Sequence, residues 1–264
     1  MSLGIAGLLL IDHTDSDGEA RTSDATTPSA ADPLVEKVAA VESLRPLMTL
    51  TQFESRLGTA TLKKALPAGT VEHVFVDPLY YVQAITDADV VMFFAVTTRS
   101  EAFSPRMGSD FNFPEAGPNS VVLGQQSFAD AMDPPQGVHL AVGVHDFSYF
   151  EVYYMGNPGN YLTYVLGLNE SGLGGISATT DFYRFPVEQL QTAINRSVLM
   201  PSDEKPWETS AAAPTLPAEL EEAYADFRRT LRVNTFAIGG PWLDFSRLRG
   251  AWIGPNYNEV RVLD

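Results

Sequence analysis

The stretch YYMGNPGNYLTYVLGL, Tyr153 to Leu168, decides the fold of this chain. Aromatic and apolar residues flank a central GNPGN, residues 156–160. Asn and Gly tolerate the left-handed backbone that tight turns need, and Pro fixes φ beside them. The stretch therefore predicts two antiparallel strands joined by a turn. Its aromatic residues leave open whether the hairpin is a recognition surface or only joins two core strands.

The sequence before this hairpin completes a larger unit. GVHLAVGVHDFSYFEV, residues 137–152, contains two strand-like runs that are broken at Asp146-Phe147. LGQQSFADAM, residues 123–132, precedes them and has a helical pattern. Residues 123–168 therefore predict a helix followed by a three-stranded antiparallel meander.

The same order occurs earlier in the chain. TLTQFESRLG, residues 49–58, predicts a helix that Thr49 or Thr51 caps and Gly58 ends. Three strand-like runs follow within residues 70–98. Both units contain an Asp-x-x-Tyr-aromatic step, which begins at Asp77 in the first and at Asp146 in the second. We therefore predict an α+β fold in which two tandem helix-plus-antiparallel-meander repeats form one curved sheet.

Beyond residue 180 the repeat is lost. PVEQLQTAINR, residues 186–196, and AELEEAYADFRRTLR, residues 218–232, predict helices. VNTFAI, residues 233–238, and NEVRVL, residues 258–263, are short strand candidates that would extend a sheet edge. We divide the chain into a stub and linker (residues 1–33), a tandem-repeat domain (residues 34–180) and a helical and extended part packed on the same domain (residues 181–264).

The N-terminal segment has two contrasting parts. Residues 3–11 form an apolar run of nine residues, whereas a helix that spans a bilayer needs about 20. Residues 12–33 carry six acidic residues and one arginine, a composition typical of a disordered linker. The run is a truncated membrane segment, a core strand fragment or a vector-derived leader. We favour the first, which predicts a membrane tether.

Composition excludes several classes of function. The formal net charge of −16, with seventeen basic residues scattered along the chain, argues against nucleic-acid binding. The absence of cysteine excludes disulfides, thiol catalysis and thiolate metal sites. We expect no cofactor and no metal site, because no nucleotide-binding or metal-binding motif stands out.

Three segments carry a resemblance to known families: FVDPLYYVQAITD (residues 75–87), GNPGNYLTYVLGLNESG (residues 156–172) and GPNYNEVRVL (residues 254–263). They resemble an uncharacterised bacterial family, the ETEC-type domain of unknown function. Its members usually carry an N-terminal transmembrane segment, so the resemblance implies a cell-envelope location; the nine-residue run is shorter than that segment. The tandem arrangement also resembles, at fold level, the beta-lactamase-inhibitor-protein-like repeats shared with small outer-membrane assembly lipoproteins.

Alternation along the predicted strands defines a candidate binding face. Successive side chains of a strand point to opposite faces. We expect the repeat helix to cover Ser148, Phe150, Val152 and Tyr154, and Leu162, Tyr164, Leu166 and Leu168 to be the buried set of the next strand. The opposite face then collects Tyr149, Glu151, Tyr153, Tyr161 and Thr163. Aromatic residues with polar ends around one carboxylate are typical of protein-binding and peptide-binding surfaces. The alternative is that the C-terminal helices pack on this face and bury it.

No catalytic residues can be assigned from the pattern. His145-Asp146 could orient an imidazole, but no serine in a nucleophile elbow accompanies the pair. We therefore predict a non-enzymatic binding or scaffold module of the bacterial cell envelope that presents its sheet to a protein or peptide. The alternatives are a hydrolase-like enzyme, a small-ligand sensor with a pocket between sheet and C-terminal helices, and a cytoplasmic location.

Overall fold

The computed structural model describes residues 32–108, 120–142, 147–157, 160–174, 218–241, 243–261 and 263. The chain divides into two compact units, Met1–Ala31 and Asp32–Asp264. All of the described residues belong to the second unit. The apolar run, residues 12–31 of the predicted linker and the helix predicted for residues 186–196 lie outside them, whereas the last two residues of that linker, Asp32 and Pro33, belong to the start of a helix.

The second unit is built on one antiparallel sheet. In the order β1-β2-β3-β4-β10-β9-β8-β7, every neighbouring pair of strands is antiparallel. The strands are β1 (Leu62–Ala65), β2 (Val71–Val76), β3 (Tyr80–Asp87), β4 (Val90–Thr98), β7 (Gly137–Val142), β8 (Phe147–Asn157), β9 (Asn160–Leu168) and β10 (Thr235–Gly239). A separate two-stranded sheet pairs β5 (Arg106–Met107) with β6 (Val121–Val122). The α+β class is confirmed.

The predicted hairpins form where their turn residues stand. Asp77 lies between β2 and β3, where its side chain accepts from the N–H of Leu79 at 2.9 Å. Asp87 pairs with Val90 across the next turn, in which Ala88 has a positive φ of 53°. Tyr161 pairs with Gly156 at the β8–β9 turn. These contacts are local, which is why the sequence could predict them.

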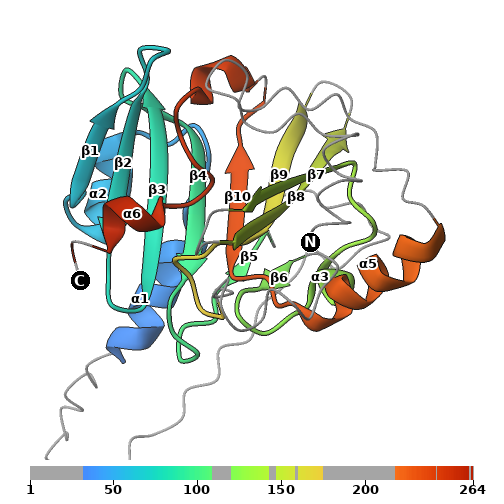
Figure 1. The fold of residues 1–264 in the computed structure, drawn as a ribbon. Coiled ribbons are helices and arrows are strands. Elements are labelled where there is room, and N and C mark those ends of the chain that lie inside the picture. Colours follow the sequence, from blue (N-terminus) through green and yellow to red (C-terminus); the bar gives the residue numbers. More distant parts are fainter. Residues whose placement is uncertain are drawn as a thin grey trace, which may run out of the picture. The chain divides into compact units, whose positions relative to one another are not determined.

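Strand β10 corrects one prediction. Residues 233–238 were expected to extend a sheet edge, but β10 lies between β4 and β9, as Figure 1 shows in orange. Its five residues are all buried, because helices cover one face and the C-terminal segment covers the other. The C-terminal part of the chain therefore joins the two meanders into one sheet.

The helices begin at polar capping residues. The Asp32 side chain accepts from the N–H of Leu34 at the start of α1 (Pro33–Glu42). Thr49 and Gln52 form a capping box at α2 (Leu50–Leu57), and Ser127 caps α3 (Phe128–Ala131). The expected helix at residues 218–232 is observed as α5 (Ala218–Thr230).

One face of the sheet, which we call the helix face, packs against these four helices. Phe53 of α2 contacts Phe94 of β4 edge-to-face at 5.5 Å between ring centroids. Farther along the sheet, Tyr149 of β8 contacts Phe128 of α3 at 5.1 Å and Phe227 of α5 at 4.8 Å. These rings belong to one hydrophobic cluster that extends across the sheet from β2 to β7. It is the main core of the unit.

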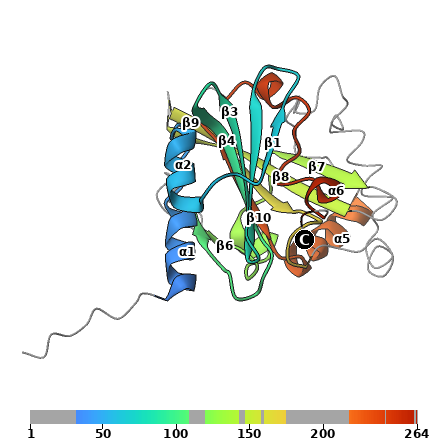
Figure 2. The ribbon, with the colours of Figure 1, turned by 90° about the vertical axis from the view of Figure 1, so that its left-hand side faces the viewer.

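The other face, which we call the second face, packs against residues 243–261. This segment contains the 3₁₀ helix η2 (Phe245–Leu248) and α6 (Tyr257–Val260), and Figure 2 shows α6 across the strands from α1 and α2. Leu248 and Ile253 join the cluster around Phe93 of β4. NEVRVL was expected to be a strand, but it begins within α6, because Asn256 caps that helix by accepting from the N–H of Asn258 at 2.9 Å.

Candidate functional site

The three predicted site residues on β8 meet in a polar network. Tyr149, Glu151 and Tyr153 alternate along the strand, so all three side chains point to the helix face. The hydroxyl of Tyr149 donates to Glu151 Oε1 at 2.6 Å, and that of Tyr153 donates to Oε2 at 2.5 Å. All three residues are buried.

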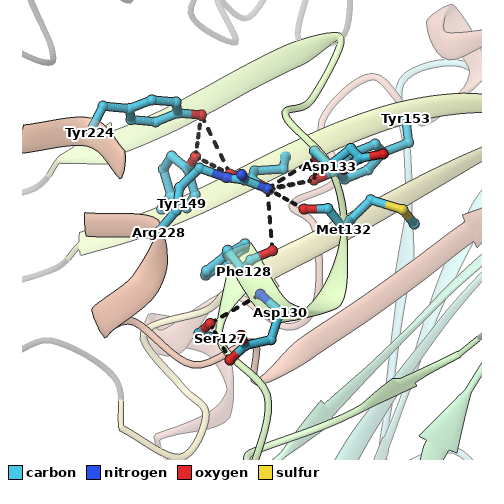
Figure 3. A network of polar contacts seen from close by, with 10 residues as sticks. Ser127, Phe128, Asp130, Met132, Asp133, Tyr149, Tyr153, Tyr224 and Arg228 are labelled. Carbon is cyan, nitrogen blue, oxygen red and sulfur yellow. Dashed lines mark hydrogen bonds and ion pairs between the residues drawn. The ribbon is translucent and has the colours of Figure 1, made fainter. Parts of the chain in front are cut away.

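Helix α5 supplies the counter-charge. Arg228 Nε donates to Glu151 Oε1 at 2.7 Å, and its Nη2 donates to Oε2 at 3.2 Å. Nη2 also donates to the carbonyl oxygens of Phe128, Met132 and Asp133, at 3.2, 2.8 and 3.1 Å. Figure 3 shows the guanidinium with Tyr149 on one side and with Met132 and Asp133 on the other. One arginine thus connects α5 to β8 and to the C-terminal end of α3.

Tyr224 of α5 completes the network. Its hydroxyl lies 2.9 Å from that of Tyr149 and 3.4 Å from Glu151 Oε1 (Figure 3). Because Tyr149 donates its only proton to Glu151, Tyr224 is the donor in the bond between the tyrosines. Burial, and next the nearby charge of Glu151, raise the pKa of Tyr149, Tyr153 and Tyr224. The tyrosines therefore remain neutral donors to a carboxylate.

This geometry corrects the prediction of an exposed aromatic face. Tyr149, Glu151 and Tyr153 are covered by α3 and α5 instead of facing solvent. The repeat helix also covers the face opposite to the expected one, because Phe128 of α3 packs on Tyr149. The physical reason is the carboxylate, which can be buried where a helix brings an arginine to it. The alternative, burial by a C-terminal helix, is confirmed for these three residues.

Strand register separates the other two predicted residues from this network. Tyr153 pairs with Tyr164, whereas Thr163 pairs with Tyr154 and Tyr161 pairs with Gly156. Paired residues share a face, so Tyr161 and Thr163 lie on the second face. Thr163 is buried there. The five predicted residues therefore do not form one surface.

An exposed aromatic pair occupies the end of the β8–β9 hairpin. Tyr154 is 55% exposed and Tyr161 is 37% exposed. Their rings stack with centroids 5.1 Å apart and an interplanar angle of 17°. The two residues are diagonal neighbours on the second face, within reach of each other for aromatic side chains. We call Tyr154 and Tyr161 the tyrosine pair.

Gln136 lies at the outer edge of β8 beside this pair. Strand β7 pairs with β8 only from Phe147 to Val152, so β8 extends beyond it. There the Gln136 side chain accepts from the N–H of Tyr154 at 2.6 Å and donates to its carbonyl at 3.3 Å. These are the two bonds that the N–H and C=O of one residue in a neighbouring antiparallel strand would make.

A second buried carboxylate lies near the opposite edge of the sheet. Glu72 of β2 is on the second face, where Gln83 donates to its Oε1. Glu72 Oε2 has no hydrogen-bond partner among the described residues and lies 3.6 Å from Lys64 Nζ. That ammonium instead bonds Glu259 of α6 at 2.8 Å. Burial, the largest cause, raises the pKa of Glu72.

The three segments that carry the family resemblance meet on the second face. Gln83 accepts from the N–H of Gly254 and donates to the carbonyl of Trp252, both at 2.9 Å. Asn169 donates to the carbonyls of Ile253 and Pro255 at 2.9 and 3.3 Å. A Cβ at Gly254 would lie 2.8 Å from Asn169, so the close fit requires glycine there. These contacts hold the C-terminal segment on the sheet.

The histidines offer no catalytic arrangement in the part of the chain that the structure describes. His73 is buried, its Nε2 lies 3.2 Å from Thr86 Oγ1, and burial lowers its pKa. His139 lies on β7, while His145 and Asp146 fall outside the described residues. Within these ranges no group of three histidine, aspartate or glutamate side chains could hold a metal ion. Among the helices described, none is long and apolar enough to cross a membrane.

Sequence reasoning missed Arg228, Tyr224, Gln136 and Tyr154. The first two stand four residues apart on α5, a spacing that places both on one side of a helix. A glutamate that alternates with two tyrosines on an apolar strand is expected to be buried, and a buried carboxylate requires a paired cation. This pattern could have indicated Arg228. No sequence pattern indicates that Gln136 binds the edge of β8, because that contact depends on where β7 ends.

Comparison of the chain with protein-family models, with curated proteins and with solved structures finds no match in any of the three.

Proposed function

We propose that this protein is a non-enzymatic binding module of the bacterial cell envelope, which presents the end of the β8–β9 hairpin to a protein or peptide. The observation that carries this proposal is the exposed, stacked tyrosine pair. Of the five residues that the sequence indicated, only Tyr161 belongs to this surface, because the other four are buried. Tyr154, which was not among the five, forms the surface together with Tyr161. Tyrosine offers a large contact area and a polar end at little cost in side-chain entropy, as binding surfaces require.

The hairpin suits a recognition role because its base is rigid. On the helix face the network of Glu151 and Arg228 fixes β8 directly beside Tyr154. The tyrosine pair therefore stands on strands whose positions are set by buried contacts. A preorganised surface loses less conformational entropy on binding than a loop does.

We propose membership of the ETEC-type family of unknown function and an envelope location, both on the strength of the sequence resemblance. The contacts of Gln83 with Gly254 and of Asn169 with Pro255 support this proposal, because they join all three resembling segments in one place. The proposed membrane tether would come from residues 3–11, which lie outside the described residues.

We also propose that the two meanders are tandem repeats. In support, β2-β3-β4 follow α2 as β7-β8-β9 follow α3, although the first unit has an additional strand, β1, between its helix and β2. Each helix begins at a hydroxyl-bearing N-cap, Thr49 or Ser127, and each of these residues also forms an isolated β-bridge. Asp77 occupies its expected turn; its proposed equivalent, Asp146, lies outside the described residues.

Photo-crosslinking in the source bacterium would test the binding function. The full chain would carry Tyr161→p-benzoylphenylalanine or, as a matched control, Tyr257→p-benzoylphenylalanine. Tyr257 lies on α6 and is 38% exposed, nearly the same as Tyr161. We expect a crosslinked protein adduct at position 161 and none at position 257. No adduct at 161, or the same adducts at both positions, would contradict the proposal.

A further inference from the structure

We propose that the overhanging edge of β8 binds an extended, basic peptide by strand addition, and that Gln136 holds the place of this peptide in the free protein. The inference rests on the proposed binding function and specifies the partner of the same site. It starts from the mismatch in length between two strands. Strand β7 pairs as far as Val152, whereas β8 continues to Asn157 and pairs there with β9.

Backbone direction defines the exposed edge. In an antiparallel sheet the N–H and C=O of one residue point to one neighbouring strand, and alternate residues point to the same side. The carbonyl of Val152 accepts from the N–H of Gln136 at 3.1 Å, and both backbone groups of Tyr154 bond the Gln136 side chain. By this alternation, Gly156 also directs its backbone toward this edge, with which no described strand pairs beyond Val152.

The Gln136 side chain shows what the edge accepts. Its amide is chemically a peptide group, and it makes with Tyr154 both bonds of a strand pair. Gln136 is exposed, so an incoming strand can displace its side chain without disturbing the core. The occupant that fits is therefore an extended backbone. Unpaired strand edges recruit such segments in known peptide-binding domains.

The side chains and the charge specify the peptide further. The tyrosine pair lies beside the edge on the second face, where side chains of an added strand would contact it. Tyrosine rings attract lysine and arginine by cation–π interaction. The protein carries a formal net charge of −16, which favours the approach of a cationic partner. The peptide is thus expected to carry lysine or arginine at alternate positions.

Binding of synthetic peptides to the full chain tests the proposal. The probe is a decapeptide in which valine and lysine alternate. One control is the same peptide methylated at every backbone nitrogen, which retains the side chains but cannot donate to a strand edge. The other control replaces each lysine by glutamate. We expect only the unmethylated lysine peptide to bind and to slow amide hydrogen exchange at Gly156.

Two variants separate strand addition from other modes of binding. Gln136→Ala removes the competing amide, so the lysine peptide should bind about tenfold more tightly. The matched control is Gln125→Ala, at another exposed glutamine that lies before α3, and its affinity should equal that of the parent. Tyr154→Ser should weaken binding in either background. If Gln136→Ala bound the lysine peptide with unchanged or lower affinity, the Gln136 side chain would not compete with the peptide for the edge of β8.

The remaining outcomes separate this inference from the proposed function. Equal binding of the methylated and unmethylated peptides, or no binding, overturns strand addition, while a protein adduct at position 161 would still support a binding module. Exchange protection at Gly156 that rises with the concentration of the protein alone would identify a second copy of the chain as the occupant. That result would overturn the assignment to a basic peptide.

Discussion

Two glutamates occupy corresponding places in the sheet but have different surroundings. Glu151 lies on β8 and Glu72 on β2, each one strand in from a sheet edge. Both are almost fully buried, at 0% and 1% exposure. Glu151 faces the helices, whereas Glu72 faces the C-terminal segment. The difference between them lies in the number of donors that reach each carboxylate.

At Glu151 the desolvation of the carboxylate is offset by several bonds. Two tyrosine hydroxyls and two nitrogens of Arg228 donate to its oxygens within 3.2 Å. At Glu72, one oxygen accepts from Gln83 and the other has no hydrogen bond among the described residues. Its nearest cation, Lys64, is 39% exposed and bonds Glu259 instead. Burial alone therefore does not predict whether a carboxylate stabilises the fold. The number of hydrogen-bond donors that reach the carboxylate decides whether its net contribution to stability is favourable or unfavourable.

The largest expected effect tests the Glu151 network. Arg228→Met leaves a buried carboxylate without its cation and removes one donor from three carbonyls, so the free energy of unfolding should fall by about 3–5 kcal/mol. Arg229→Met is the matched control, because Arg229 is exposed and lies 3.4 Å from exposed Asp226. It should cost less than about 0.5 kcal/mol. Urea unfolding at neutral pH measures both values.

A double variant distinguishes loss of the ion pair from loss of packing. Glu151→Met combined with Arg228→Met removes both charges, so it should be more stable than Arg228→Met alone. A double variant that is less stable than the single one would show that Glu151 stabilises the fold even without Arg228, through its bonds with Tyr149 and Tyr153. The comparison of the two glutamates would then lose its electrostatic basis.

The intermediate effect concerns pH at Glu72. Because burial raises its folded pKa above the ordinary value of 4.5, the folded state binds the proton more tightly than the unfolded state. Its contribution to stability is thus complete below about pH 4.5 and is lost as the pH rises through the folded pKa. Relative to Glu72→Gln, the parent should lose stability between pH 4.5 and pH 8.

Parallel urea titrations of the two proteins across this range measure the difference. Taking the difference cancels the other titrating groups, except for Lys64 and Glu259, which contact Glu72 or its neighbour directly. If the difference in the free energy of unfolding between the parent and Glu72→Gln stayed constant with pH, the desolvation of the Glu72 carboxylate would be offset as fully as that of Glu151.

The same contrast explains which features could be predicted from the sequence. The hairpins at Asp77 and at residues 156–160 depend on local turn chemistry, and α2 depends on the capping residue Thr49. The position of β10 and the packing of α5 depend on contacts between residues far apart in the chain. Glu151 and Arg228, for example, are 77 residues apart. No local pattern specifies which helix reaches which strand.

The prediction of the candidate site failed where it depended on the register between two strands. Alternation placed Tyr149, Glu151 and Tyr153 together correctly, because it acts within one strand. Combining them with Tyr161 and Thr163 required the pairing between β8 and β9, and a shift of one residue transfers a whole strand to the other face. The observed pairs, such as Tyr153 with Tyr164, place Tyr161 beside Tyr154. The exposed tyrosine pair therefore emerges only from the structure.

The smallest expected effect refines the account of Glu151. Tyr224 donates to the Tyr149 hydroxyl at 2.9 Å but lies 3.4 Å from the carboxylate, so it supports the network mainly through Tyr149. Tyr224→Phe removes this neutral bond and retains the ring, which predicts a loss of about 1 kcal/mol in the free energy of unfolding. Tyr153→Phe removes a direct, charge-assisted bond to Glu151 and should cost more. If both variants lost the same stability in urea unfolding, direct and indirect donors would count equally, and the number of donors alone would distinguish Glu151 from Glu72.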